Sequence, residues 1–210
     1  MPTDLVKRLL DALSRPLPGL EAQLRMAPRP RVGWDPLTIP EGTRDGAALL
    51  LIYPHDEAFY LPLTVRGSGM RNHTGQVSLP GGGVDNGETI EAAAVREAEE
   101  EIGVDRRQVQ VLGRLTPLHI PVSNFLLHPV VGVVPARPAF NRAEWEVARI
   151  IEPTLEQLRD PATVKREFRT RTTAGQAIQV DVPFFDIQDE KVWGATAMVL
   201  AEFCAILASL

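Results

Sequence analysis

The sequence predicts a single α/β domain preceded by an N-terminal helical extension. A chain of 210 residues fits one hydrophobic core of ordinary size. Hydrophobic residues make up 44% of the chain and charged residues 23%, a balance typical of a folded globular protein. Strand-length apolar runs are interspersed with a few helical stretches. We therefore expect a helix and arm over residues 1–44 and the folded domain over 45–210.

The extension begins with an amphipathic stretch. Leu5, Leu9, Leu10 and Leu13 recur at helical spacing before a proline-rich turn ends the pattern. The following segment, 25–46, is rich in proline and has no sustained periodicity. It is predicted to be an extended arm that leads into the domain.

The domain itself is predicted to contain both strands and helices. Apolar runs predict strands at 47–53 and 59–65, and a polar loop follows at 67–75. A helix is predicted from Thr89 to Gly103, because Ile90, Ala94, Ala98 and Ile102 step by four and define a buried stripe. The remaining elements are predicted as strands at 109–115 and 126–135, a short helix at 156–159, a hairpin at 165–172 and 177–182, and a closing helix at 195–210.

The predicted helix carries an unusual set of acids. Glu97, Glu100 and Glu101 are three and four residues apart, so they share one face about one turn long. Like charges at these spacings destabilise a helix by roughly 0.2 to 0.5 kcal/mol per pair. A divalent cation such as Mg²⁺ or Mn²⁺ would offset this cost, because such ions prefer oxygen ligands. The alternative interpretation is a solvated acidic face.

The segment before the helix favours the cation interpretation. Three glycines at 81–83 let the backbone approach a ligand closely, and we expect them to form a loop. Glu88 and Arg96 lie about two helical turns apart, so an ion pair between them could hold this loop against the helix. Taken singly, the glycines could be a turn and the two charges a surface pair.

These residues together resemble the box of the Nudix family, G-x5-E-x7-R-E-U-x-E-E-x-G-U, where U is a bulky aliphatic residue. The match starts at Gly82 and departs only at Ala98, which is smaller than the usual aliphatic residue. The resemblance implies an α/β/α sandwich around a mixed β-sheet and hydrolysis of a pyrophosphate bond by metal-activated water. It also implies Mg²⁺ or Mn²⁺ as cofactor and the following site residues: Glu97, Glu100 and Glu101 as metal ligands, supported by Glu88 and Arg96.

A second motif bears on the substrate. The segment from Leu63 to Gly82 is similar to the second motif of coenzyme A pyrophosphatases, L-L-T-x-R-(S/A)-x3-R-x3-G-x3-F-P-G-G, with departures at Pro62, Gly67 and Leu79. Leu79 keeps an apolar side chain where that pattern has Phe. The resemblance implies coenzyme A or a derivative as substrate, with 3',5'-ADP and 4'-phosphopantetheine as products. The substrate-binding residues it implies are Arg66, Arg71, Gly81 and Gly82.

Other interpretations stay open. The two arginines could be ordinary surface residues, and the substrate could be another nucleoside diphosphate derivative, such as ADP-ribose or a dinucleotide. A non-catalytic ligand-binding Nudix domain is a third hypothesis, although such proteins typically lose box carboxylates that are all present here.

The composition of the chain excludes several classes of binding partner and covalent cross-link. A net charge of -5 argues against nucleic-acid binding, no apolar run is long enough to cross a membrane, and Cys204 alone cannot form an internal disulfide. We expect a cytoplasmic protein that binds a small nucleotide, with a homodimer as one hypothesis for its oligomeric state.

Overall fold

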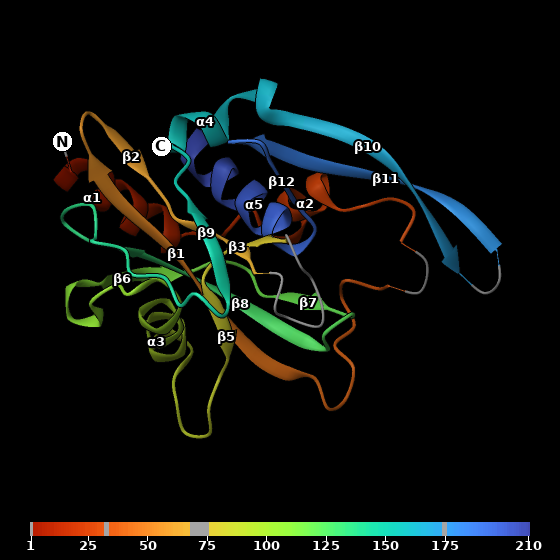
Figure 1. Cartoon of the computed structure of the whole chain (residues 1–210), viewed down its shortest axis with the longest axis horizontal. Coiled ribbons are helices and arrows are strands. Elements are labelled where there is room, and N and C mark those ends of the chain that lie inside the picture. Colours follow the sequence, from red (N-terminus) through yellow and green to blue (C-terminus); the bar gives the residue numbers. More distant parts are fainter. Residues whose placement is uncertain (1, 32–33, 68–75, 174–175) are drawn as a thin grey trace.

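The computed structural model describes residues 2–31, 34–67, 76–173 and 176–210 (Figure 1). The helices in these segments are α1 (Pro2–Leu13), α2 (Gly19–Gln23), α3 (Ile90–Ile102), α4 (Leu155–Arg159) and α5 (Ala195–Ser209). Short 3-10 helices are η1 (Leu24–Met26), η2 (Arg106–Gln108) and η3 (Pro161–Thr163). None of the helices so described is long and apolar enough to cross a lipid bilayer.

A mixed sheet of six strands forms the centre of the molecule. Its path is β2-β1-β8-β6, with β5 paired to β1 and β7 paired to β8. Only β1 and β8 run parallel, and the other pairs are antiparallel. Its strands are β1 (Arg44–His55), β2 (Ala58–Tyr60), β5 (Gly81–Gly83), β6 (Gln110–Arg114), β7 (Leu118–Ile120) and β8 (Phe125–Val133).

Strand β1 is buried on both faces, because helices cover the sheet on either side. Successive side chains of a strand point to opposite faces. Ala47, Leu49 and Leu51 pack in one apolar cluster with Ala94, Ala98 and Ile102 of α3. The intervening residues Ala48, Leu50 and Ile52 belong to a second cluster that contains α5. The chain is therefore an α/β/α sandwich, as expected.

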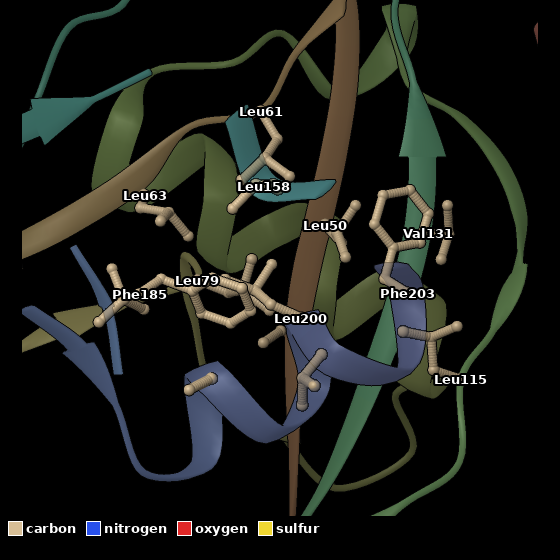
Figure 2. Close-up of a cluster of buried hydrophobic side chains, with 14 of the residues drawn as sticks. Leu50, Leu61, Leu63, Leu79, Leu115, Val131, Leu158, Phe185, Leu200 and Phe203 are labelled. Atoms are coloured by element: carbon tan, nitrogen blue, oxygen red, sulfur yellow. The ribbon is translucent and has the colours of Figure 1, made fainter. Parts of the chain in front are cut away.

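The α5 side holds the larger apolar cluster. Figure 2 shows Leu200 and Phe203 of α5 among Leu50 of β1 and Val131 of β8. All four side chains are fully buried. Burial of this kind typically contributes about 1.5 to 3 kcal/mol per large side chain relative to leaving it exposed. Helix α5 is thus fixed against the sheet along its length.

The N-terminal extension packs onto the same side. Leu9 of α1, together with Met26 and Ala27, is buried within the α5 cluster. Glu202 of α5 is also fully buried, and it accepts hydrogen bonds from Gly19 N at 3.2 Å and Gln23 Nε2 at 2.8 Å. The helix predicted near the N-terminus is present as α1, whereas α2 was not anticipated. The domain boundary near residue 45 stays a prediction.

Two smaller sheets complete the described fold. One has the order β4-β3-β9 and the other β10-β11-β12. In Figure 1 the β10–β11 hairpin runs past α5 and reaches out to the right of the molecule. The strands are β3 (Leu63–Arg66), β4 (Val77–Ser78), β9 (Val147–Ile151), β10 (Val164–Thr173), β11 (Gln176–Ile187) and β12 (Glu190–Trp193).

One local expectation was wrong. The glycines at 81–83 form strand β5 instead of a loop, with Gly46, Ala47 and Ala48 of β1 opposite Gly83, Gly82 and Gly81. Glycine is normally disfavoured in strands because it has no side chain to pack. Here the lack of a side chain is what permits pairing, because a Cβ on Gly81 would lie 2.4 Å from the carbonyl oxygen of Ala47.

Candidate active site

The site is built around the second half of α3, whose ends are well defined. The Thr89 side chain accepts a hydrogen bond from Ala92 N at 3.2 Å, and Gly103 ends the helix with φ 73°. The acids Glu97, Glu100 and Glu101 therefore lie in the last turns, where the helix dipole disfavours negative charge, and the last turn itself contains no basic residue. Local helix stability does not explain their presence.

Arg96 connects the acids to the residues before the helix. Its Nε and Nη2 each donate to Glu88 at 3.0 Å, and Nη2 also donates to the carbonyl oxygen of Gly83 at 3.0 Å. The Glu88–Arg96 ion pair predicted from the spacing is thus confirmed. The hydrogen bond from Arg96 is the main cause that lowers the pKa of Glu88. Strand β5 and α3 are consequently fixed to each other through one guanidinium.

The same guanidinium reaches two of the candidate metal ligands. Its Nη1 donates to Glu97 Oε1 at 2.8 Å and to Glu100 Oε2 at 3.3 Å. Glu97 is mostly shielded from solvent, whereas the Glu100 side chain is 59% exposed. The candidate metal ligands therefore lie on the same part of the helix but differ in their exposure to solvent.

Glu101 is the most buried of these carboxyl groups. Its exposed fraction is 6%, and no donor among the described residues lies within hydrogen-bonding distance of Oε2. Burial, followed by the negative charges of Glu146 and Glu97, raises the pKa of Glu101 to about 8. Burial also raises the pKa of Glu97, against the opposing effect of Arg96. A buried, unpartnered carboxylate oxygen is costly and indicates a missing positive partner.

The glycine strand lies directly against Glu97. A Cβ on Gly82 would come within 2.5 Å of the Glu97 carboxyl atoms, so any larger residue would push that group aside. On Gly83, by contrast, a Cβ would meet no atom within 4 Å. The predicted role of Gly81 and Gly82 in substrate binding stays a prediction, but both residues border the acidic site.

A fourth carboxylate, Glu146, was not anticipated from the sequence. Its Oε1 lies 3.2 Å from Arg66 Nη2, and its charge raises the pKa of both Glu97 and Glu101. Backbone hydrogen bonds fix its turn: Ala143 N donates to Glu101 O at 2.8 Å, and Gly67 N donates to Glu146 O at 2.9 Å. No spacing pattern marks Glu146, because its neighbours in space are distant in the sequence.

Only part of the second motif, Leu63 to Gly82, lies within the residues that the structure describes. Arg66 ends β3 and reaches the acidic site through Glu146. Leu79 is buried in the α5 cluster, which confirms its expected apolar role. Arg71 and its neighbour His73 lie outside the described residues, so the proposed pairing of Arg66 with Arg71 on phosphate stays a prediction.

The donor set fits a divalent cation. All candidate ligands are carboxylate oxygens, which Mg²⁺ and Mn²⁺ prefer, and Glu101 Oε2 lacks a partner. In segments 2–31, 34–67, 76–173 and 176–210, no three His, Cys, Asp or Glu side chains are already arranged around one point. Arg96 instead holds one oxygen each of Glu97 and Glu100. An ion would therefore compete with Arg96 for these two acids.

Comparison with known proteins decides the family. The family model described as the NUDIX domain matches residues 42–171, more than half of the chain. The chain belongs to the Nudix family. Nudix hydrolases act on pyrophosphate bonds and generally use divalent metal ions, so this Nudix chain is a pyrophosphate-bond hydrolase.

Relatives in sequence cover most of this Nudix hydrolase. An uncharacterized Nudix hydrolase NudL from Photorhabdus laumondii is 33% identical over 85% of this chain and 89% of its own length. The NudL of an Enterobacter species is 36% identical over 83% of this chain and 86% of its own length. The similarity thus extends well beyond the motif that runs from Gly82 to Val104.

Solved structures support the Nudix fold. RenU, a Nudix hydrolase from M. smegmatis, superimposes with a TM-score of 0.53 at 18% identity, over 80% of this chain and 89% of that one. The Ap4A hydrolase from C. elegans gives 0.54 at 17% identity, over 79% and 100%. Similarity at this level shows the shared architecture.

Proposed function

We propose that this Nudix hydrolase cleaves the pyrophosphate bond of coenzyme A or its derivatives, with Mg²⁺ or Mn²⁺ held by Glu97, Glu100 and Glu101. The products would be 3',5'-ADP and 4'-phosphopantetheine. The observation that carries the proposal is the position of Arg66. This residue of the coenzyme A-type motif points to the carboxylate cluster through Glu146 at 3.2 Å. This contact supports the proposal that a phosphate-binding arginine and metal-binding acids serve one site.

The residues divide into two roles. Arg66 supplies a fixed positive charge that can bind a phosphate oxygen of the substrate. Arg96 and Glu88 hold α3 against β5 and so keep Glu97 and Glu101 beside the glycine backbone. A bound divalent ion would supply activation of water and neutralisation of charge on phosphorus.

Product analysis tests the substrate. Purified protein in Mg²⁺ is incubated separately with coenzyme A, dephospho-coenzyme A, ADP-ribose and NADH, and products are separated and identified by mass. We expect coenzyme A to be cut with the highest kcat/KM. Dephospho-coenzyme A lacks the 3'-phosphate and one charge-assisted contact, worth about 1.5 to 3 kcal/mol. Its kcat/KM should therefore be lower than that of coenzyme A by roughly tenfold or more. A higher kcat/KM for ADP-ribose or NADH would reject the coenzyme A assignment.

A matched pair of variants tests the metal ligands. Glu101→Gln removes the charge of a buried carboxylate while keeping its shape, and it should reduce turnover by several orders of magnitude. Glu99→Gln alters a neighbouring acid of the same helix that pairs with Arg106, so its turnover should stay near wild type. Wild-type turnover of Glu101→Gln in saturating Mg²⁺ would show that the metal assignment is wrong.

A further inference from the structure

Glu146 lies between a cation and two candidate metal ligands. On one side it forms an ion pair with Arg66, whose side chain is 32% exposed while that of Glu146 is 29% exposed. On the other side, the turn that carries Glu146 is hydrogen-bonded to the backbone of Glu101: Glu146 N donates to Ala143 O at 3.0 Å, and Ala143 N donates to Glu101 O at 2.8 Å. Backbone hydrogen bonds fix the turn at 143–146, while the Glu146 side chain is partly exposed, so a rotation of this side chain requires no change in the backbone.

Ligand binding changes the interactions that are favourable on the two sides of Glu146, at the candidate metal ligands and at Arg66. A divalent ion beside Glu97 and Glu101 attracts a further carboxylate more strongly than a monovalent guanidinium does. A substrate phosphate oxygen, in turn, needs Arg66 free of its carboxylate partner. Movement of the Glu146 carboxylate from Arg66 to the ion would satisfy both conditions at once.

We infer that Glu146 is exchanged between Arg66 and the bound divalent ion, so that metal loading releases Arg66 for the substrate phosphate. This inference rests on the proposed metal-dependent function. It makes the binding of metal and of phosphate mutually favourable, because coupling between two sites is reciprocal. Glu146 acts here as a positioning residue that decides when Arg66 is available.

Metal affinity without substrate tests the exchange. Mn²⁺ binding is measured by isothermal titration calorimetry for wild type, Arg66→Ala, Glu146→Gln and the double variant, each checked for folding by circular dichroism. Arg66→Ala frees Glu146 for the ion, and we expect Mn²⁺ to bind about two- to fivefold more tightly, in line with the modest strength of a partly exposed ion pair. Glu146→Gln should weaken Mn²⁺ binding, and in that background Arg66→Ala should strengthen binding less than it does in the wild-type background.

The double variant separates exchange from simple charge removal. Loss of a nearby positive charge strengthens cation binding by itself, and that effect would be equal with or without Glu146. Arg106→Ala is the matched control, because Arg106 pairs with Glu99 and its charge also acts on Glu100. An Arg66→Ala effect of the same size in both backgrounds, or no larger than that of Arg106→Ala, overturns the exchange.

The outcome is distinguishable from failure of the proposed function. If Glu101→Gln abolishes Mn²⁺ binding while the Arg66 and Glu146 variants act independently, the exchange is rejected and the metal-dependent hydrolase stands. If Glu101→Gln binds Mn²⁺ as wild type does, the metal assignment itself is wrong and the exchange is rejected with it.

Discussion

At the scale of single residues, the three glycines of β5 have different surroundings. Replacing each of them in turn with alanine should therefore have a different effect at each position. A methyl group on Gly82 meets the end of the Glu97 side chain at 2.5 Å. Gly82→Ala should therefore displace Glu97 and lower kcat/KM by about tenfold or more while the protein stays folded, since 1.4 kcal/mol of lost transition-state stabilisation is a factor of ten. Steady-state kinetics and a thermal melt measure both effects.

The neighbouring glycines provide the comparison. Gly83→Ala meets no atom within 4 Å and should leave activity and stability unchanged. Gly81→Ala brings a methyl group to 2.6 Å from the Ala48 Cα, a backbone clash that should destabilise the fold by about 1 to 3 kcal/mol. Equal losses of activity in the Gly82 and Gly83 variants would contradict this account.

Glu101 should make the metal-free protein less stable as pH rises. Its pKa is about 8 when folded, against 4.5 for the ordinary group, so the folded chain keeps a proton that the unfolded chain has released. Stability is therefore lost with increasing pH between these two values. Glu101→Gln mimics the protonated group at every pH. In a chelator, its melting temperature should exceed that of wild type at pH 9 and match it at pH 5. An equal difference at both pH values would exclude this cause.

At the scale of elements, Glu202 joins the N-terminal extension to α5. Besides Gly19 and Gln23, it accepts a hydrogen bond from Thr116 Oγ1 at 2.7 Å. Glu202→Ala would leave these buried and partly buried donors without their partner and should lower the free energy of unfolding by about 3 kcal/mol or more, as measured by urea titration. Glu21→Ala, which removes an exposed acid of α2, should have no measurable effect. A Glu202→Ala change no larger than this control would mean that the extension contributes little to the core.

Elements with strong local signals could be predicted from the sequence. Helix α3 has a capping Thr89, a terminal Gly103 and a buried stripe, and all three are local features. Strand β5 gave no such signal, because its pairing depends on close contact with β1 and not on its own side chains. Of the predicted helix stripe, only Ile90 is partly exposed instead of buried, at the first turn of the helix.

At the scale of the whole molecule, the site depends on contacts between distant segments. Glu88, Arg96, Glu97 and Glu101 could be identified because one short segment contains them. Glu146 could not, because it meets Arg66 across 80 residues and only through the pairing of β3 with β9. The residues of the box could thus be predicted from a linear pattern. The carboxylate that links the proposed metal site to Arg66 becomes visible only in the tertiary structure.

The contacts of Arg96 have a consequence for how the enzyme can be stored and regenerated. A guanidinium within the chain already offsets the charges of Glu88, Glu97 and Glu100. We therefore expect folding not to require a metal ion, in contrast to small zinc domains that unfold in a chelator. Treatment with EDTA should abolish hydrolysis yet leave the circular dichroism spectrum unchanged, and added Mg²⁺ should restore full turnover within the time of mixing. Unfolding in EDTA would show that Arg96 alone cannot hold these acids together.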